Sequence, residues 1–235
     1  MPWQEAITAI TTLSPDQIVL ALAVFSALML VIEDRRLVLI PLVAQYMLLP
    51  LLATPVLYRP IVWVRWGLGL AVGILLLLTA SHMERRERSI ILDQEPQTDP
   101  SPARQTLLAN TSMGTMFRVF SVVLSGLAAY GLHQAYPLEL VPAEVNLASY
   151  LLIIVGLILM IAGIGPLRAG IGLLVLLNGF QSLYAFLEHS LLVIGMLGVL
   201  DLLIALGIVV CTEFWLQSIH AQADAAAADS RTVLS

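Results

Sequence analysis

Seven long apolar runs constrain this chain more than any other feature. Each has about 17 or more mostly apolar residues between charged residues or turn signals, and a helix of roughly 20 residues spans the 30 Å hydrocarbon core of a bilayer. The runs are 16–32, 37–58, 61–81, 116–132, 148–164, 169–187 and 191–216. None shows the alternation of a membrane β-barrel. They predict an all-α, polytopic membrane protein with about seven transmembrane helices.

Composition supports this class and excludes others. Of the 235 residues, 59% are hydrophobic and 11% charged, and the mean hydropathy is +0.93. All 11 basic residues are arginine, so a lysine Schiff base, and with it a retinal pigment, is excluded. The single Cys211 allows no intramolecular disulfide. A net charge of -5 argues against nucleic acid as a partner.

The arginines predict the orientation in the membrane, because short cytoplasmic loops carry the excess of basic residues. Nine arginines fall on one side if the runs are helices that cross in turn: Arg35, Arg36, Arg85, Arg86, Arg88, Arg104, Arg118, Arg168 and Arg231. Only Arg59 occupies a loop on the other side, which is acidic. We therefore expect an external N-terminus and a cytoplasmic C-terminus. Residues 1–13 lack a basic start and a cleavage pattern, so the first helix is expected to be a retained anchor.

A polar, proline-containing stretch, DQEPQTDPSPAR, divides the chain into two membrane parts. The predicted divisions are a three-helix half at 1–92, a cytoplasmic linker at 93–115, a four-helix half at 116–217 and a cytoplasmic tail at 218–235. The second run contains Pro41, Pro50 and Pro55, which predict a kinked or locally opened helix. Packing explains such a kink more simply than a gating or binding element does.

Polar residues inside the apolar runs are costly and mark candidate sites. Asp201 lies ten residues after Leu191, about 15 Å into its helix, and Asn178 lies nine residues before Leu187, at a similar depth. A short turn joins the two helices, so they should be antiparallel neighbours with Asn178 in contact with Asp201. Gln181, one turn from Asn178, extends this polar face. The pattern predicts either a proton or ion relay, or a hydrogen bond that only locks two helices together.

The other polar residues indicate less. Arg65 is a candidate intramembrane charge, but four residues from the start of its run it is expected to extend outward as an interfacial anchor. His82, His133, His189 and His220 lie at the ends of runs, an arrangement that disfavours haem. The sequence has no nucleophile motif, metal-ligand spacing or phosphate loop, so we expect no cofactor and no enzymatic activity of the chain alone.

From Pro166 the chain reads PLRAGIGLLVLLNGFQSLYAFLEHSLLVIGMLGVLDLLIALGIVV. This stretch resembles the hydrogenase-4 component E family, whose last three helices are similar to the K subunit of respiratory complex I and to the C subunit of multisubunit sodium/proton antiporters. The shared features are an arginine in a cytoplasmic turn (Arg168), an Asn-Gly pair ten residues later (Asn178 and Gly179) and a mid-helix acid about two dozen residues further on (Asp201).

The resemblance implies a subunit of a redox-driven, ion-translocating complex in the prokaryotic inner membrane. Its partners would be antiporter-like membrane subunits and a hydrogenase-like or quinone-linked redox module, and Asp201 would match the acid of the family's last helix. One departure concerns the relay. The family usually has a glutamate directly before Asn-Gly, whereas this chain has Leu177, which favours a connector or a path completed by partner residues or water.

The sequence therefore predicts a non-catalytic membrane-arm subunit in which Asp201, Asn178 and Gln181 contribute to an ion pathway or brace it. Two rivals remain open. A stand-alone transporter or channel would use the kinked second helix and Arg65 to line a substrate cavity. A purely structural assembly subunit would keep assembly and pumping intact when Asp201 is replaced by asparagine.

Overall fold

The computed structural model describes residues 14–32, 34, 36–52, 59–93, 115–163, 165–187 and 190–233, and every regular element within them is an α-helix. The helices are α2 (Pro15–Val31), α3 (Leu39–Leu52), α4 (Arg59–Asp93), α6 (Thr115–Ala135), α7 (Ala143–Ala162), α8 (Pro166–Leu187) and α9 (Leu191–Val233). Each apolar run of the sequence coincides with one of them. The last part of the second run, residues 53–58 with Pro55, lies outside the described residues.

Five of these helices are long and apolar enough to cross a membrane, by length and composition: α4, α6, α7, α8 and α9. The helices α2 and α3 are equally apolar but shorter, with 17 and 14 residues. The protein is thus an all-helical, multi-pass membrane protein.

Local signals explain where several helices begin and end. The backbone nitrogen of Ser14 donates to Gln17 Oε1 at 3.1 Å, and Pro15 occupies the first turn of α2, as expected for a capping box. In α3, Pro50 is the third residue from the end, and its missing N–H and its ring favour termination of the helix nearby. Gly165, between α7 and α8, has φ of 101°, a conformation that side chains other than glycine rarely adopt.

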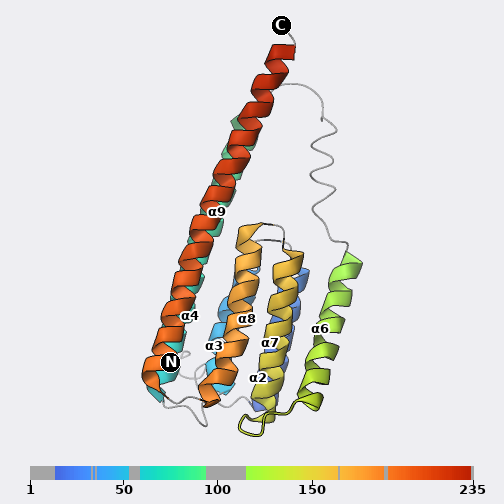
Figure 1. Cartoon of the computed structure of the whole chain (residues 1–235), viewed down its shortest axis with the longest axis vertical. Coiled ribbons are helices and arrows are strands. Elements are labelled where there is room, and N and C mark those ends of the chain that lie inside the picture. The colour runs from blue at the N-terminus through green and yellow to red at the C-terminus, as the bar shows by residue number, and fades with distance from the viewer. Residues whose placement is uncertain are drawn as a thin grey trace, which may run out of the picture.

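Four helices form a closed ring at the centre of the molecule. In order around it, α2 contacts α3, α3 contacts α8, α8 contacts α7, and α7 contacts α2. The pair α4 and α9 packs on one side, where α4 contacts α3 and α9 contacts α8, while α6 packs on the other side against α2 and α7 (Figure 1).

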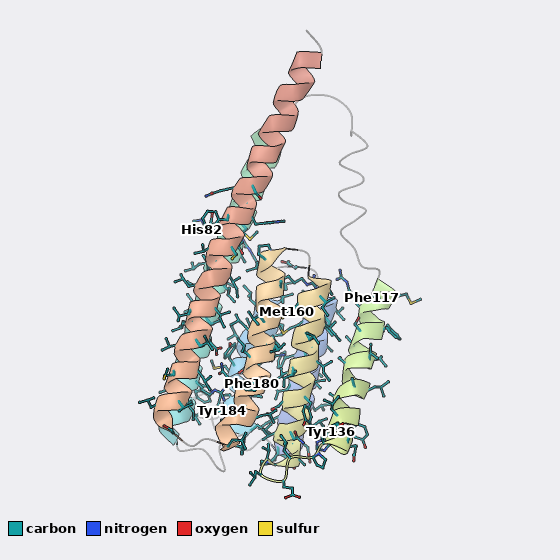
Figure 2. All side chains as sticks on the ribbon, in the orientation of Figure 1. His82, Phe117, Tyr136, Met160, Phe180 and Tyr184 are labelled. Carbon is teal, nitrogen blue, oxygen red and sulfur yellow. The ribbon has the colours of Figure 1, made fainter. Side chains whose placement is uncertain are left out.

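The outer surface of this bundle is apolar. Phe117 of α6 and Phe180 of α8 are both exposed, as are large aliphatic side chains of α4 and α9. Figure 2 places the labelled Phe117 near one end of the bundle and Tyr136 at the other, at the two ends of α6. A broad apolar exterior of this kind fits contact with lipid rather than with water.

Two arginines hold the last turn of α2. Arg118 Nη1, from α6, donates to the carbonyl oxygen of Val31 at 3.0 Å, and Arg168 Nη2, from α8, donates to that of Ile32 at 3.1 Å. Cations are favourable there because the carbonyls at a helix C-terminus lack intrahelical donors. These bonds bring the end of α2 and the beginnings of α6 and α8 to the same end of the bundle.

The helices α4 and α9 continue beyond their apolar spans, Val62–Met83 and Leu192–Ser218. Figure 1 shows α4 behind α9, with both running past the ends of the other helices. Residues 218–233, expected as a tail, therefore continue α9 as helix. Of the expected linker 93–115, residues 94–114 lie outside the described part of the chain.

Glycine lets the backbones of α7 and α8 approach each other closely. A Cβ atom added to Gly156 would lie 2.5 Å from the backbone nitrogen of Leu176 and 2.6 Å from the carbonyl oxygen of Gly172. Small residues allow such backbone approach in membranes, where packing rather than the hydrophobic effect drives helix association. The ring is therefore fixed by shape on its α7–α8 side.

Replacing Gly156 by valine should separate α7 from α8 and destabilise the protein by about 1–3 kcal/mol, the usual cost of overpacking. Thermal unfolding in mild detergent would measure the effect. Gly126→Val on α6 is the matched control, because nothing lies within 4 Å of a Cβ at that position. Equal melting temperatures of the two variants would contradict the proposed role of the α7–α8 contact.

Candidate polar site inside the bundle

Four polar side chains from four different helices meet where the pair α4 and α9 packs against α3 and α8. They are Tyr46 of α3, Arg65 of α4, Gln181 of α8 and Asp201 of α9, and all four are buried. Asp201 is only 2% exposed and Arg65 only 8%. Two groups that ordinarily carry charge are thus withdrawn from the lipid-facing surface.

The four side chains form one hydrogen-bonded chain. Gln181 Nε2 donates to Asp201 Oδ1 at 2.7 Å, and Arg65 Nη2 donates to Gln181 Oε1 at 3.1 Å. The hydroxyl of Tyr46 donates to Asp201 Oδ2 at 3.4 Å, a long bond. An amide has both a donor and an acceptor, so Gln181 can join the guanidinium to the carboxyl group.

The chain of bonds runs along the helices from one end of the bundle toward its middle. Arg65 lies six residues after the start of α4 and Gln181 six before the end of α8, about 9 Å by helical rise in each case. Asp201 lies ten residues after the start of α9, about 15 Å. The backbone of Arg65 therefore lies nearer to that end of the bundle than the backbone of Asp201 does.

Asp201 and Gln181, expected together from the sequence, are hydrogen-bonded. The expected contact between Asn178 and Asp201 is wrong: Asn178 is buried, but its Nδ2 atom has no hydrogen-bond partner among the described residues. Gln181, three residues further along α8, instead donates to Asp201 and to the carbonyl oxygen of Leu197.

The expected outward extension of Arg65 is also wrong. Its guanidinium turns into the bundle and binds Gln181. A position near a helix end permits snorkelling but does not require it, and a buried carboxyl group on a neighbouring helix gives the cation a better electrostatic environment than an apolar surface does. Arg168, expected in the turn between two helices, lies instead in the first turn of α8, where it binds the end of α2.

Tyr46 is the member of the site that sequence reasoning missed. It lies inside an apolar run, where a tyrosine attracts little notice. Gly69 on α4 makes room for it, since a Cβ at Gly69 would lie 2.5 Å from Tyr46 Cβ. A tyrosine at the middle of a short apolar helix, opposite a glycine of the next helix, was the available signal.

The chemistry of these four groups suits proton exchange more than catalysis. A carboxyl group can take up and release a proton, a phenol can donate and accept one, and an amide or a guanidinium does neither near neutral pH. In the part of the chain that the structure describes, no three His, Cys, Asp or Glu side chains gather to hold a metal ion. Tyr46 and Asp201 are therefore the exchangeable pair of the site.

Comparison with protein-family models, with curated proteins and with solved structures finds no match to this chain.

Replacing Gln181 by leucine keeps the volume but removes the bridge between Arg65 and Asp201. Two buried polar groups then lose a partner, and we expect a destabilisation of about 2–5 kcal/mol, measured by unfolding in mild detergent. Gln134→Leu is the control, because Gln134 is exposed and bonds only Tyr130 on its own helix. Similar effects of the two substitutions would show that the buried bridge contributes nothing.

Proposed function

We propose that this protein is a non-catalytic membrane subunit of a redox-driven, ion-translocating complex, in which the buried site around Asp201 passes protons or braces the pathway of its neighbours. The observation that carries the proposal is the hydrogen-bonded set Tyr46, Arg65, Gln181 and Asp201 inside an otherwise apolar bundle. Ionisable groups at such depth usually mark ion or proton pathways.

The resemblance of the last three helices to hydrogenase-4 component E supplies the class of complex. On this proposal, antiporter-like membrane subunits and a hydrogenase-like or quinone-linked redox module are the partners, and the complex lies in the inner membrane of a prokaryote. The chain spans the membrane seven times, with α2 and α3 as short crossings, an external N-terminus and a cytoplasmic C-terminus. Arg118 and Arg168 support this orientation, since both lie at one end of the bundle.

Groups from the N-terminal helices can compensate for the glutamate that Leu177 replaces. The N-terminal helices bring two groups to Asp201 that the resembling region lacks: a phenol from α3 and, through Gln181, a guanidinium from α4. Tyr46 gives the carboxyl group an exchangeable neighbour within the same chain. We infer that α3, through Tyr46, completes the relay in place of the second carboxylate, while Arg65 of α4 binds Gln181.

Replacing Asp201 by asparagine tests the relay, because the amide keeps size and hydrogen bonding but does not titrate. We expect normal assembly and a loss of ion translocation of roughly two orders of magnitude or more, the usual scale for removing a proton-transfer group. The measurement is redox-driven ion uptake by inverted membrane vesicles. Glu213→Gln, on the same helix near the end of its apolar span, is the control.

Intact pumping in the Asp201→Asn vesicles would instead support a structural assembly subunit.

Purification through a C-terminal tag in mild detergent tests which proteins are the partners. Antiporter-like proteins that co-purify with iron-sulfur or nickel-iron subunits are the expected result. A clean monomer or homo-oligomer that transports solute in liposomes would establish the stand-alone transporter.

Tyr46→Phe should slow translocation by up to about tenfold while leaving assembly intact, because it removes one hydrogen bond to Asp201 and one exchangeable proton. Initial rates of ion uptake, normalised to the amount of assembled complex, would measure this. Tyr130→Phe serves as control, since Tyr130 is exposed on α6 and its hydroxyl accepts only from Gln134. An unchanged rate in Tyr46→Phe would remove Tyr46 from the relay.

A further inference from the structure

A second buried polar layer lies inside the ring of α2, α3, α7 and α8, beside the site around Asp201. Each helix of the ring contributes one polar side chain: Ser26 from α2, Gln45 from α3, Ser149 from α7 and Asn178 from α8. None is more than 1% exposed. Because every helix of the ring contributes one such residue, the four side chains form a set and are not isolated buried polar groups.

Four close approaches between the helices indicate that the four side chains lie at similar depths. Gln45 Nε2 donates to Ser26 Oγ at 3.0 Å, which ties α2 to α3. A Cβ at Gly179, next to Asn178, would lie 2.9 Å from the carbonyl oxygen of Ser149, so α7 and α8 face each other at this level. Asp201 relates the level of α3 to that of α8, because it binds both Tyr46 and Gln181. Tyr46 is next to Gln45 in α3, and Gln181 is one turn from Asn178 in α8.

Three atoms of this layer lack a protein partner. Within the described part of the chain, Gln45 Oε1, Ser149 Oγ and Asn178 Nδ2 are buried and make no hydrogen bond. Buried side-chain amides and hydroxyls almost always have a partner, from protein or from ordered water. The set contains an acceptor, a donor and a hydroxyl that can act as either. One water molecule can both donate and accept hydrogen bonds, so it could satisfy all three atoms.

We propose that Gln45, Ser149 and Asn178 hold ordered water inside the ring of α2, α3, α7 and α8. Asn178 donates to this water, Gln45 accepts from it, and the Ser149 hydroxyl completes its coordination. The water site stands on the geometry of the layer alone. Its consequence rests on the proposed function: the water, with the Ser26–Gln45 pair, extends the polar route from the Asp201 side of the bundle toward α2.

Asn178→Leu tests this site, because a bound water and a dry interior predict opposite signs. If water is bound, leucine removes one of its partners and leaves Gln45 Oε1 and Ser149 Oγ unsatisfied, so the melting temperature in mild detergent falls. If the interior is dry, leucine removes an unsatisfied N–H and the melting temperature rises. A rise would overturn the proposal.

Two controls separate this effect from general packing. Thr212 Oγ1, on α9, is also buried without a partner among the described residues but belongs to no such layer, so Thr212→Val should leave the melting temperature unchanged or raise it. Ser149→Ala provides a milder change within the layer and should lower it. It keeps the test available if Asn178→Leu does not fold.

A crystal structure at a resolution that shows ordered water would test the proposed water site directly. The expected result is a peak within hydrogen-bond distance of Asn178 Nδ2 and Gln45 Oε1, lost in Asn178→Leu. Well-defined side chains with no peak between them would refute the water site. Neither readout uses ion translocation, so a failed relay and a dry layer are distinguishable outcomes.

Discussion

The cost of taking a carboxyl group out of water organises the interior of this protein. Asp201 lies among apolar helices, so it must be given partners by its neighbours. Gln181 and Tyr46 supply them, and Gln181 passes one of its bonds on to Arg65. Because these residues come from α3, α4, α8 and α9, satisfying one side chain fixes how four helices stand against one another. The N-terminal and C-terminal halves of the chain are thus joined through a polar contact.

The remaining contacts are mostly matters of shape. The helices α7 and α8 approach until only glycine fits at Gly156 and Gly172, and Gly69 admits the ring of Tyr46. Different interactions therefore stabilise the two sides of the bundle. The α7–α8 side is held by close backbone packing, and the side that faces α4 and α9 contains the bonds whose strength depends on protonation. Changes in the protonation of Asp201 act directly on the second side.

Most of the fold could be predicted from the sequence, because apolar runs report membrane helices almost without regard to tertiary context. The beginning of α2 also followed the local rules of helix ends, whereas the bonds of Arg118 and Arg168 to the end of α2 join residues far apart in the sequence and were not predicted. The site was only half predictable. Asp201 and Gln181 were visible as polar residues at similar depths, but depth along a helix says nothing about direction around it. Without that direction, Asn178 was expected beside Asp201. Arg65 was expected to extend outward because it lies near the start of its run. Tyr46 could be identified only together with the glycine on the neighbouring helix.

The unbroken length of α9 has a mechanical consequence. The helix runs 43 residues without interruption, about 64 Å by helical rise, and carries Asp201 near one end of it. Its other end projects past the bundle beside α4 (Figure 1). A continuous helix is stiff in torsion, so a twist applied to the projecting end turns the carboxyl group by a similar angle against Gln181 and Tyr46. A rotation of α9 about its axis would therefore change the bonds of Asp201 to Gln181 and Tyr46.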